Sequence, residues 1–564
     1  MMESSQPNII IILNDDMGYS DLGCYGGEIQ SPNLDYLAEN GLKFTEFYNT
    51  ARCAPSRASL LTGLHPHQTG IGILVSDDRP EGYTGTLNRN CVTIAEVLQE
   101  KGYRTYMSGK WHLCHEIRKP NDAWPNKRGF DHFYGIITGA TPYYWPRTLV
   151  RDNQNIEKEA KMNPDFYLTD AITNNAIQYL LDHFKSYKNS PFFLYVAYTA
   201  PHWPLHAKDK DVQKYRGQFD SGWDKLRQER LKQMIKKGII HPDWLLTPRD
   251  SGEKPWEDVI HKDWEARRME VYAAQIDAMD QGIGKILDTL QEHNQLNNTF
   301  ILFLSDNGGC AEEILSYYRV GAQLGVFPEG RPRTKYNKRV KFGNITRNIP
   351  GPEDTYMSYG RAWANLSNTP FRLYKHWTHE GGIATPFIVH YPDGIPFKGE
   401  LRAQPAFLPD IMATILDLTG ASYPISYHGN EIYPLEGVSL IPVFNEKSLG
   451  ERKLFFEHEG NAAVRDGKWK LVRNYPGDWE LYNMMDDRTE LHNIIQEHPQ
   501  KANELIRAYE TWAKRVRVFP RKHKFIASYG KFIGSIVYNM QRRRKLKKIQ
   551  SDMKIFEQYW KSHK

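Results

Sequence analysis

A chain of 564 residues is too long for one ordinary hydrophobic core, so its length favours one large domain with a smaller one, or two comparable domains. The composition, 40% hydrophobic and 25% charged, supplies a large globular core and excludes an intrinsically disordered chain. With 73 basic and 67 acidic residues, the formal net charge of +6 is too small an excess to indicate a nucleic-acid partner.

The first apolar run, residues 9–13, is only long enough for a strand. No basic segment or cleavage site precedes it, so the sequence predicts no signal peptide. We therefore expect a cytoplasmic protein, or a periplasmic or secreted one if a leader has been removed. No later stretch approaches the roughly 20 apolar residues of a membrane span, so none is expected.

Three apolar runs are predicted as buried strands, and helical patterns over 170–184 and 271–291 lie between or near them. This alternation predicts an α/β fold with a mostly parallel sheet that helices cover on both faces. Chemistry in such sheets gathers beyond the carboxyl ends of the strands, so the polar segments that follow these runs are candidates to meet at one site. Run 8–13 is followed by Asn14-Asp15-Asp16, run 191–198 by Thr199-Ala200-Pro201-His202, and run 299–304 by Ser305-Asp306-Asn307-Gly308-Gly309.

The pattern of apolar and polar residues changes in the C-terminal part of the chain. Residues 311–370 show little periodicity and predict a long irregular insertion at a functional rim. Beyond about residue 440, the runs 453–458, 462–465 and 468–472 predict short antiparallel strands with a turn at Asp466-Gly467. We therefore divide the chain into a large domain, 1–440, and a smaller α+β domain, 441–564.

The smaller domain ends in a basic tail that is predicted to be helical. A solvated helix face is the favoured interpretation, and an anionic partner such as a polyanionic glycan or a membrane surface stays open. The basic residues are Arg521, Lys522, Lys524, Arg542, Arg543, Arg544, Lys545, Lys547 and Lys548.

The five cysteines are scattered and odd in number, which argues against a disulfide framework and against a zinc cluster of CxxC type. A lone cysteine is most often a buried structural residue. Cys53, however, opens a distinctive segment, and a helix beginning near Ser56 would direct its positive N-terminal end at an anion. That segment is Cys53-Ala54-Pro55-Ser56-Arg57-Ala58-Ser59-Leu60-Leu61-Thr62-Gly63.

A second group of residues offers hard oxygen ligands. Asp15 and Asp16 follow one predicted strand, and Asp306 and Asn307 follow another. Each pair alone is more often a cap or a turn. Carboxylate and amide oxygens without imidazole or thiolate suit calcium or magnesium better than zinc.

A third group is a set of cationic side chains: Lys110, His112, His202 and Lys375. Such groups would surround an ester anion and stabilise the negative charge that develops as its bond to the leaving oxygen breaks. Three further histidines are expected to have ordinary structural roles: His115, His376 and His379.

Together these motifs resemble the type I, formylglycine-dependent sulfatases, and the bacterial arylsulfatase branch in particular. In that family Cys-x-Pro-x-Arg is the segment that the formylglycine-generating enzyme recognises, and the eleven-residue match makes a merely structural Cys53 a poor explanation. The resemblance covers nearly the whole chain and is weakest after about residue 515. It includes Ser31-Pro32-Asn33-Leu34-Asp35, Arg128-Gly129-Phe130-Asp131, Gly222-Trp223-Asp224-Lys225-Leu226-Arg227, Tyr359-Gly360-Arg361-Ala362-Trp363-Ala364 and Glu490-Leu491-His492-Asn493.

The resemblance implies an alkaline-phosphatase-like α/β fold, with residues 1–440 as the catalytic sulfatase domain, and a sulfuric ester hydrolase activity. It also implies a formylglycine-generating maturation enzyme as a partner and one divalent ion, calcium by preference, with magnesium or manganese as alternatives. The implied metal ligands are Asp15, Asp16, Asp306, Asn307 and the formylglycine oxygen at Cys53.

The remaining site residues take catalytic roles in this interpretation. Arg57 would orient the hydrated aldehyde, and Lys110 and Lys375 would hold sulfate oxygens. His202, with Lys375, would protonate the leaving alcohol, and His112 would act as the base that releases sulfate.

Two other functions stay open. One is a formylglycine-dependent phosphonate or phosphodiester hydrolase on the same fold. The other is a glycan-binding pseudo-enzyme whose Cys53 is never converted. Among sulfate esters a sulfated carbohydrate is the expected substrate, with an aryl sulfate as the alternative. The insertion 311–370 and an aromatic group would then form a sugar platform, although a packed core patch explains the aromatics equally well: Tyr143, Tyr144, Trp145 and His206.

Overall fold

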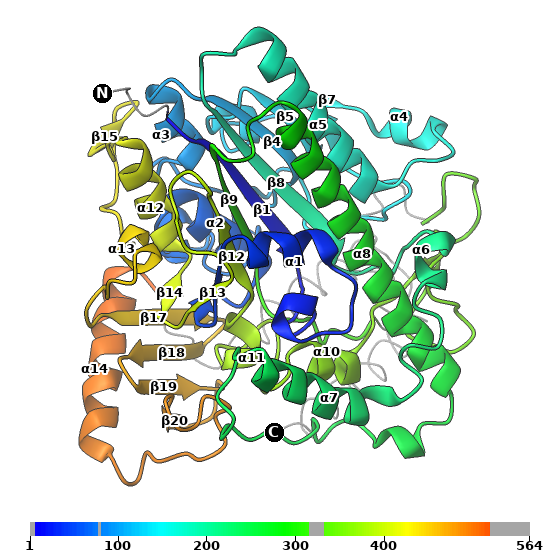
Figure 1. Ribbon diagram of the computed structural model, residues 1–564, viewed down its shortest axis with the longest axis vertical. Helices are drawn as coiled ribbons and strands as arrows, with labels where there is room; N and C mark the ends of the chain where they lie inside the picture. Colours follow the sequence, from blue (N-terminus) through cyan, green and yellow to red (C-terminus); the bar gives the residue numbers. More distant parts are fainter. Residues whose placement is uncertain (1–5, 77–80, 315–331, 519–564) are drawn as a thin grey trace, which may run out of the picture.

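The structure is a computed structural model that describes residues 6–76, 81–314 and 332–518. Within these residues, ten strands form one mixed sheet at the centre of the molecule (Figure 1). In spatial order they are β13 (Glu400–Arg402), β2 (Leu42–Phe44), β12 (Phe387–His390), β9 (Thr299–Ser305), β1 (Asn8–Asp15), β8 (Phe192–Pro201), β4 (Arg104–Lys110), β5 (His132–Ile136), β6 (Leu149–Arg151) and β7 (Gln154–Asn155).

The five strands from β9 to β5 are mutually parallel, whereas β12, β6 and β7 pair in antiparallel fashion. In β1, Ile10 and Ile12 contribute to one hydrophobic core, and Ile9 and Ile11 contribute to the core on the opposite face. Successive side chains of a strand point to opposite faces, so a sheet buried on both faces requires an uninterrupted apolar run. This requirement explains the four consecutive isoleucines of β1.

Helices cover both faces of the sheet. The core that contains Ile10 also includes residues of α1 (Pro32–Glu39), α5 (Leu168–Ser186) and α8 (Lys262–Glu292). The core that contains Ile9 includes residues of α2 (Cys53–Thr62), α3 (Ile94–Glu100) and α12 (Pro409–Thr419). No helix of the described ranges is both long and apolar enough to cross a membrane. Other helices before the small C-terminal sheet are α4 (Glu157–Met162), α6 (Asp209–Gln213), α7 (Gly222–Lys236), α10 (Arg361–Ser367), α11 (Glu380–Ile383) and α13 (Ile441–Phe444).

The predicted fold class is confirmed. The runs 8–13, 191–198 and 299–304 correspond to β1, β8 and β9, which are neighbours in the sheet, and the helical patterns correspond to α5 and α8. The insertion 311–370 is less irregular than expected, because it contains α10 and the short pair β10 (Lys341–Phe342) and β11 (Thr355–Tyr356). Residues 315–331 of that insertion lie outside the described residues.

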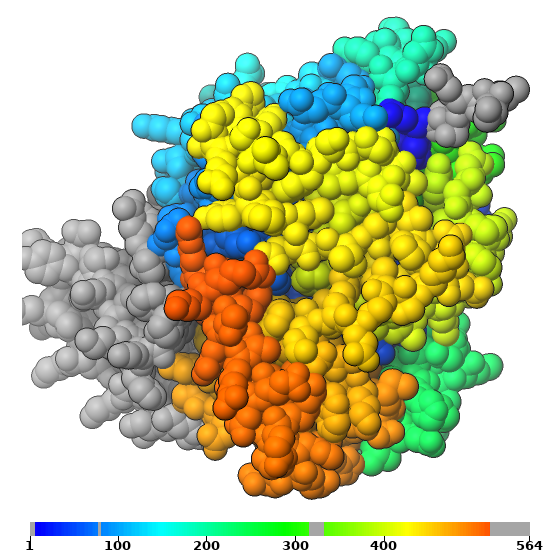
Figure 2. All heavy atoms as spheres, turned by 90° about the vertical axis from the view of Figure 1, so that its left-hand side faces the viewer, coloured from blue at the N-terminus to red at the C-terminus, as the bar shows by residue number. Residues whose placement is uncertain are grey.

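A four-stranded antiparallel sheet follows at one end of the large sheet (Figure 1). Helix α14 (Pro499–Arg515) packs on it through Leu505 and Trp512, and in Figure 2 this orange helix lies beside the yellow segments near residues 400–440. The boundary at residue 440 stays a prediction, and the basic tail lies outside the described residues. The strands are β17 (Lys453–His458), β18 (Asn461–Asp466), β19 (Trp469–Arg473) and β20 (Trp479–Asn483).

Buried ion pairs join helix α11, just before β12 of the large sheet, to the small sheet and the segment that follows it. Glu380, the first residue of α11, accepts from Lys470 Nζ of β19 at 2.7 Å and from Arg488 Nε at 2.8 Å. Burial alone would raise the pKa of Glu380, but the charges of Lys470 and Arg488 outweigh it and lower the pKa to about 2. This junction fixes the segment just after Lys375 against the small sheet.

Candidate active site

The polar residues at the carboxyl ends of β1 and β9 lie close together at one edge of the sheet. The backbone N–H of Asp16 donates to Asp306 Oδ1 at 3.3 Å, and Asn307 Nδ2 donates to Asp16 Oδ1 at 2.7 Å. Asp15, Asp16, Asp306 and Asn307 are all at most 1% exposed. The convergence follows from the register, because β1 lies between β8 and β9 with all three strands parallel.

These oxygens have the chemistry of a site for a hard divalent cation. Asp15 Oδ1 and Asn307 Oδ1 are buried and have no hydrogen-bond partner. Burial and the neighbouring charge of Asp15 raise the pKa of Asp306, despite Arg57 nearby. Crowded buried carboxylates of this kind are stabilised when a cation binds between them, and oxygen ligands suit calcium or magnesium. The residues present therefore fit the predicted metal.

Cationic side chains surround the same carboxylates. Lys110, at the end of β4, donates to Asp15 Oδ2 at 2.6 Å, and Lys375 Nζ lies 2.8 Å from Asp16 Oδ1. Arg57 donates to Asp306 Oδ2 at 2.8 Å. Three carboxylates thus face three cations, so a bound divalent cation would leave the site positive and favour an anionic ester.

Cys53 lies at the edge of this cluster. Its residue is 3% exposed, and its Sγ lies 3.4 Å from Nδ1 of His112. Burial, followed by the charges of Lys110 and Arg57, holds the pKa of His112 well below its usual range, so this imidazole is a neutral proton acceptor at neutral pH.

The helix that carries Cys53 begins earlier than the sequence predicted. The predicted start near Ser56 is wrong, because the N–H of Ser56 donates to the carbonyl oxygen of Arg52 at 2.9 Å, and this bond closes a first turn that begins at Cys53. The residue therefore sits at the N-terminus of α2 itself, where the helix dipole favours negative charge.

His202 follows β8 and lies beside the Asp16 carboxylate. Its Nε2 lies 3.4 Å from Asp16 Oδ2, and its Nδ1 lies 2.6 Å from the carbonyl oxygen of Trp203. A carbonyl oxygen only accepts, so Nδ1 carries a proton and Nε2 is the atom available to the site. Burial lowers the pKa of His202, although the charges of Asp16 and Asp15 oppose the shift.

The structure brings all ten predicted site residues to one place, but not every candidate around them. Tyr143 and His206 are about 1% exposed, and the Tyr143 hydroxyl donates to the carbonyl oxygens of Thr199 and His202 at 2.7 and 2.9 Å. His206 Nε2 lies 2.7 Å from the carbonyl oxygen of Thr355. These two residues form a packed patch that supports the His202 loop, which excludes them from a sugar platform.

Sequence reasoning missed Glu312. Its two carboxylate oxygens accept from Arg52, beside Cys53, at 2.8 Å and from the indole N–H of Trp203, beside His202, at 3.2 Å. It therefore links the segments that carry the thiol and the histidine. No motif marks this glutamate, which lies within the irregular insertion.

The fold and this site together define a class of protein: a hydrolase with a mixed, mostly parallel central sheet, whose buried carboxylates and cations act on an anionic ester. Comparison with known proteins gives the family. The sulfatase family model matches residues 7–421, and a model described as N-sulphoglucosamine sulphohydrolase, C-terminal, matches residues 371–514. The chain belongs to the sulfatase family and is a sulfuric ester hydrolase.

Individual relatives agree with this assignment. The chain is 32% identical to an uncharacterised sulfatase of Schizosaccharomyces pombe, covering 93% of this chain and 96% of the relative. It is 32% identical to an arylsulfatase of Klebsiella aerogenes, covering 80% and 94%. The crystal structure of Ps i-CgsB in complex with k-i-k-neocarrahexaose is similar with a TM-score of 0.63 and 25% identity, covering 90% and 93%.

Proposed function

We propose that the protein hydrolyses a sulfated carbohydrate by means of Cys53 converted to formylglycine. The observation that carries this proposal is the Cys53 thiol at the start of α2, 3.4 Å from His112 and next to the buried carboxylate and cation cluster. Membership of the sulfatase family supports a sulfate ester as the substrate. The segment Cys53-Ala54-Pro55-Ser56-Arg57 supports conversion of Cys53 to formylglycine by a maturation enzyme.

The proposed metal ligands are Asp15, Asp16, Asp306, Asn307 and the oxygen at position 53. A calcium ion held there would polarise the sulfate oxygens and the nucleophilic hydroxyl. Magnesium or manganese would serve the same purpose less well. The two buried, unpartnered oxygens of Asp15 and Asn307 support this assignment.

The other side chains bind the ester and move protons. Lys110 and Lys375 hold the sulfate oxygens, and Arg57 fixes the Asp306 carboxylate, to which it donates at 2.8 Å. Asp306 accepts the proton of the attacking hydroxyl. His202 protonates the leaving alcohol through Nε2 in its doubly protonated form, which the neighbouring Asp16 and Asp15 carboxylates favour against the effect of burial. Neutral His112 accepts the proton whose removal releases sulfate.

A sugar substrate is proposed because its hydroxyl is a poor leaving group, for which a positioned acid such as His202 is needed. The relative solved with k-i-k-neocarrahexaose supports an oligosaccharide. The arylsulfatase of Klebsiella aerogenes makes an aryl sulfate the second candidate.

The experiment is a panel of sulfated sugars of known linkage, nitrophenyl sulfate and matched phosphate esters, assayed with wild type and three variants. Cys53→Ala should be inactive and folded, and Cys53→Ser should be nearly inactive. Cys91→Ala, a control at a buried cysteine outside the site, should retain activity. Higher rates on the phosphate esters, or turnover by Cys53→Ala, would contradict the proposal.

A further inference from the structure

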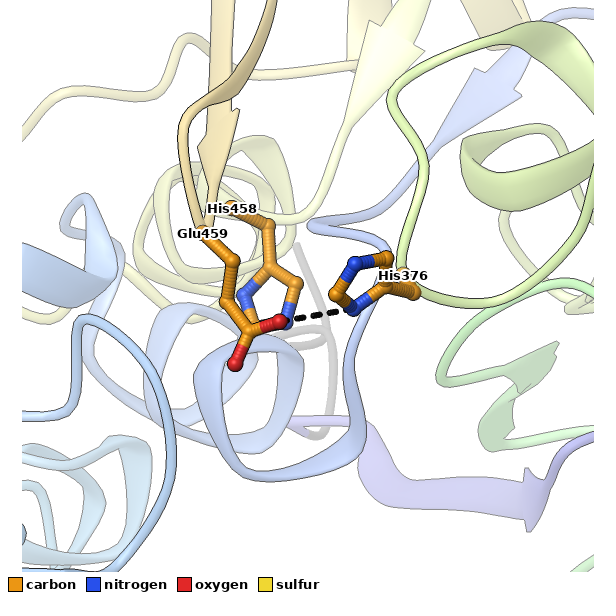
Figure 3. A group of neighbouring side chains, drawn as sticks. All are labelled: His376, His458 and Glu459. Atoms are coloured by element: carbon orange, nitrogen blue, oxygen red, sulfur yellow. Dashed lines mark ion pairs between the residues drawn. The ribbon is translucent and has the colours of Figure 1, made fainter. Parts of the chain in front are cut away.

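A second cluster of ligand-type side chains lies where the small sheet meets the Lys375 loop. It consists of His376, the residue after Lys375, together with His458 and Glu459 (Figure 3). His458 ends β17, and Glu459 begins the turn into β18. One ligand atom from each of the three residues lies within 4.8 Å of those of the other two.

The three side chains point toward one another from two separate segments (Figure 3). His376 Nδ1 lies 2.8 Å from Glu459 Oε2, and the rings of His376 and His458 are 5.5 Å apart between centroids. The side chains of His376 and Glu459 are 26% and 20% exposed, whereas residue His458 is fully buried. A small ion could therefore enter from solvent and reach a buried ligand.

The backbone holds two of these residues in an unfavourable conformation. His376 has φ +95° and Glu459 has φ +53°, in the left-handed region that non-glycine residues rarely occupy. Glu459 and Gly460 form a two-residue hairpin turn, in which asparagine or aspartate is the usual first residue. A glutamate at this position extends its carboxylate to His376, and such conformations persist mainly where function or surrounding structure requires them.

Contacts on both sides fix the cluster in place. The N–H of His376 donates to the carbonyl oxygen of Ala51 at 2.7 Å, and Asn461 Nδ2 donates to the carbonyl oxygen of His376 at 3.1 Å. Ala51 lies two residues before Cys53. The cluster therefore connects the small sheet to the backbone on either side of the active site.

We propose that His376, His458 and Glu459 form a second divalent-metal site, of the zinc type and distinct from the catalytic oxygen site. Two imidazoles and one carboxylate form a zinc ligand set that leaves one coordination position open. Hard cations such as calcium prefer all-oxygen sites, so the two sites select different metals. Tetrahedral zinc ligands lie about 3.3 Å apart given Zn–N bonds of ~2.0–2.1 Å, so side-chain rotations of modest size close the site.

The charge of Glu459 suits this role. Burial would raise its pKa, but His376 and His458 hold the pKa well below its usual range, so the carboxylate is ionised at neutral pH. A bound zinc ion would fasten the β17–β18 turn to the loop of Lys375. The site therefore predicts zinc-dependent stability that is separate from the catalytic metal.

The test is a zinc titration of the full-length protein saturated with calcium, in competition with a chromophoric chelator. Wild type should bind one zinc ion through this cluster, and its melting temperature should rise by about 3 °C at a hundredfold excess over Kd. Both effects should be lost in His458→Ala and in Glu459→Gln, a milder change at a partly exposed residue. They should persist in the control His428→Ala, which alters an exposed histidine outside the cluster.

A second control separates the two metal sites. Asp16→Asn changes the catalytic oxygen cluster, and zinc binding to His376, His458 and Glu459 should survive it. The proposal is overturned if wild type binds no zinc, if Glu459→Gln and His428→Ala bind zinc equally, or if only Asp16→Asn abolishes binding.

Discussion

Replacement of His202 by alanine should affect substrates according to the quality of their leaving group. His202 Nδ1 is held by the carbonyl oxygen of Trp203 at 2.6 Å, which leaves Nε2 directed at the carboxylates, 3.4 Å from Asp16. The imidazole is therefore already oriented before substrate binds. In the proposed mechanism its removal deletes a positioned proton donor while leaving the cationic residues Lys110 and Lys375 in place.

The magnitude follows from what the leaving group needs. A positioned general acid contributes about 10²–10⁴-fold when the departing oxygen must be protonated in the transition state. A hundredfold loss corresponds to about 2.7 kcal/mol of transition-state stabilisation. Nitrophenolate departs without a proton, so hydrolysis of nitrophenyl sulfate should fall much less than hydrolysis of a carbohydrate sulfate.

The assay is kcat/KM for both substrates with wild type, His202→Ala and His206→Ala. His206 lies four residues further along the same loop, and its Nε2 lies 2.7 Å from the carbonyl oxygen of Thr355, so its loss should disturb the loop and lower both rates alike. Equal losses on both substrates in His202→Ala would show that His202 binds sulfate, and the acid would then have to be Lys375.

Three further outcomes are expected. Arg57→Met leaves the buried Asp306 carboxylate without its 2.8 Å partner. The free energy of unfolding, measured in urea, should fall by about 3 kcal/mol. A fall below about 0.5 kcal/mol would contradict a buried Arg57–Asp306 ion pair. Chelation should abolish activity, calcium should restore it best and zinc should not, whereas full activity in a sample found metal-free by elemental analysis would refute the metal assignment. The pKa of Glu380 is lowered from 4.5 to about 2 in the folded protein, so its stabilising contribution is complete above about pH 4.5 and is lost as the pH falls toward 2. Glu380→Gln should therefore flatten the acid side of the stability profile, measured as unfolding free energy between pH 2 and 5, and an unchanged slope would contradict the ion-pair account.

The central fold could be predicted because its strands carry strong local signals. A strand buried on both faces must be apolar throughout, so β1, β8 and β9 stand out in the sequence. The polar residues that end these strands are therefore easily recognised. Parallel pairing then brings Asp15 and Asp306 together although about 290 residues separate them. The edge strands of two or three residues, such as β7 and β13, are too short to show any period.

The less predictable features depend on contacts between distant segments. The histidine at position 376 was expected to be structural, because nothing local marks it, and its partners His458 and Glu459 lie about 80 residues further on in the small sheet. Glu312 likewise gains its importance only from Arg52 and Trp203. Such clusters arise from packing between elements, which a single sequence does not encode locally.

The most direct test of the formylglycine mechanism is the mass of the Cys53 peptide in enzyme whose sulfatase activity is measured in parallel. Trypsin cleaves after Arg52 and Arg57 and releases the segment Cys53-Ala54-Pro55-Ser56-Arg57. Conversion of the thiol to the aldehyde lowers its mass by about 18 Da. Across preparations with different degrees of maturation, kcat should rise in proportion to the aldehyde fraction. Full activity in a preparation that carries only the unmodified thiol would contradict the mechanism.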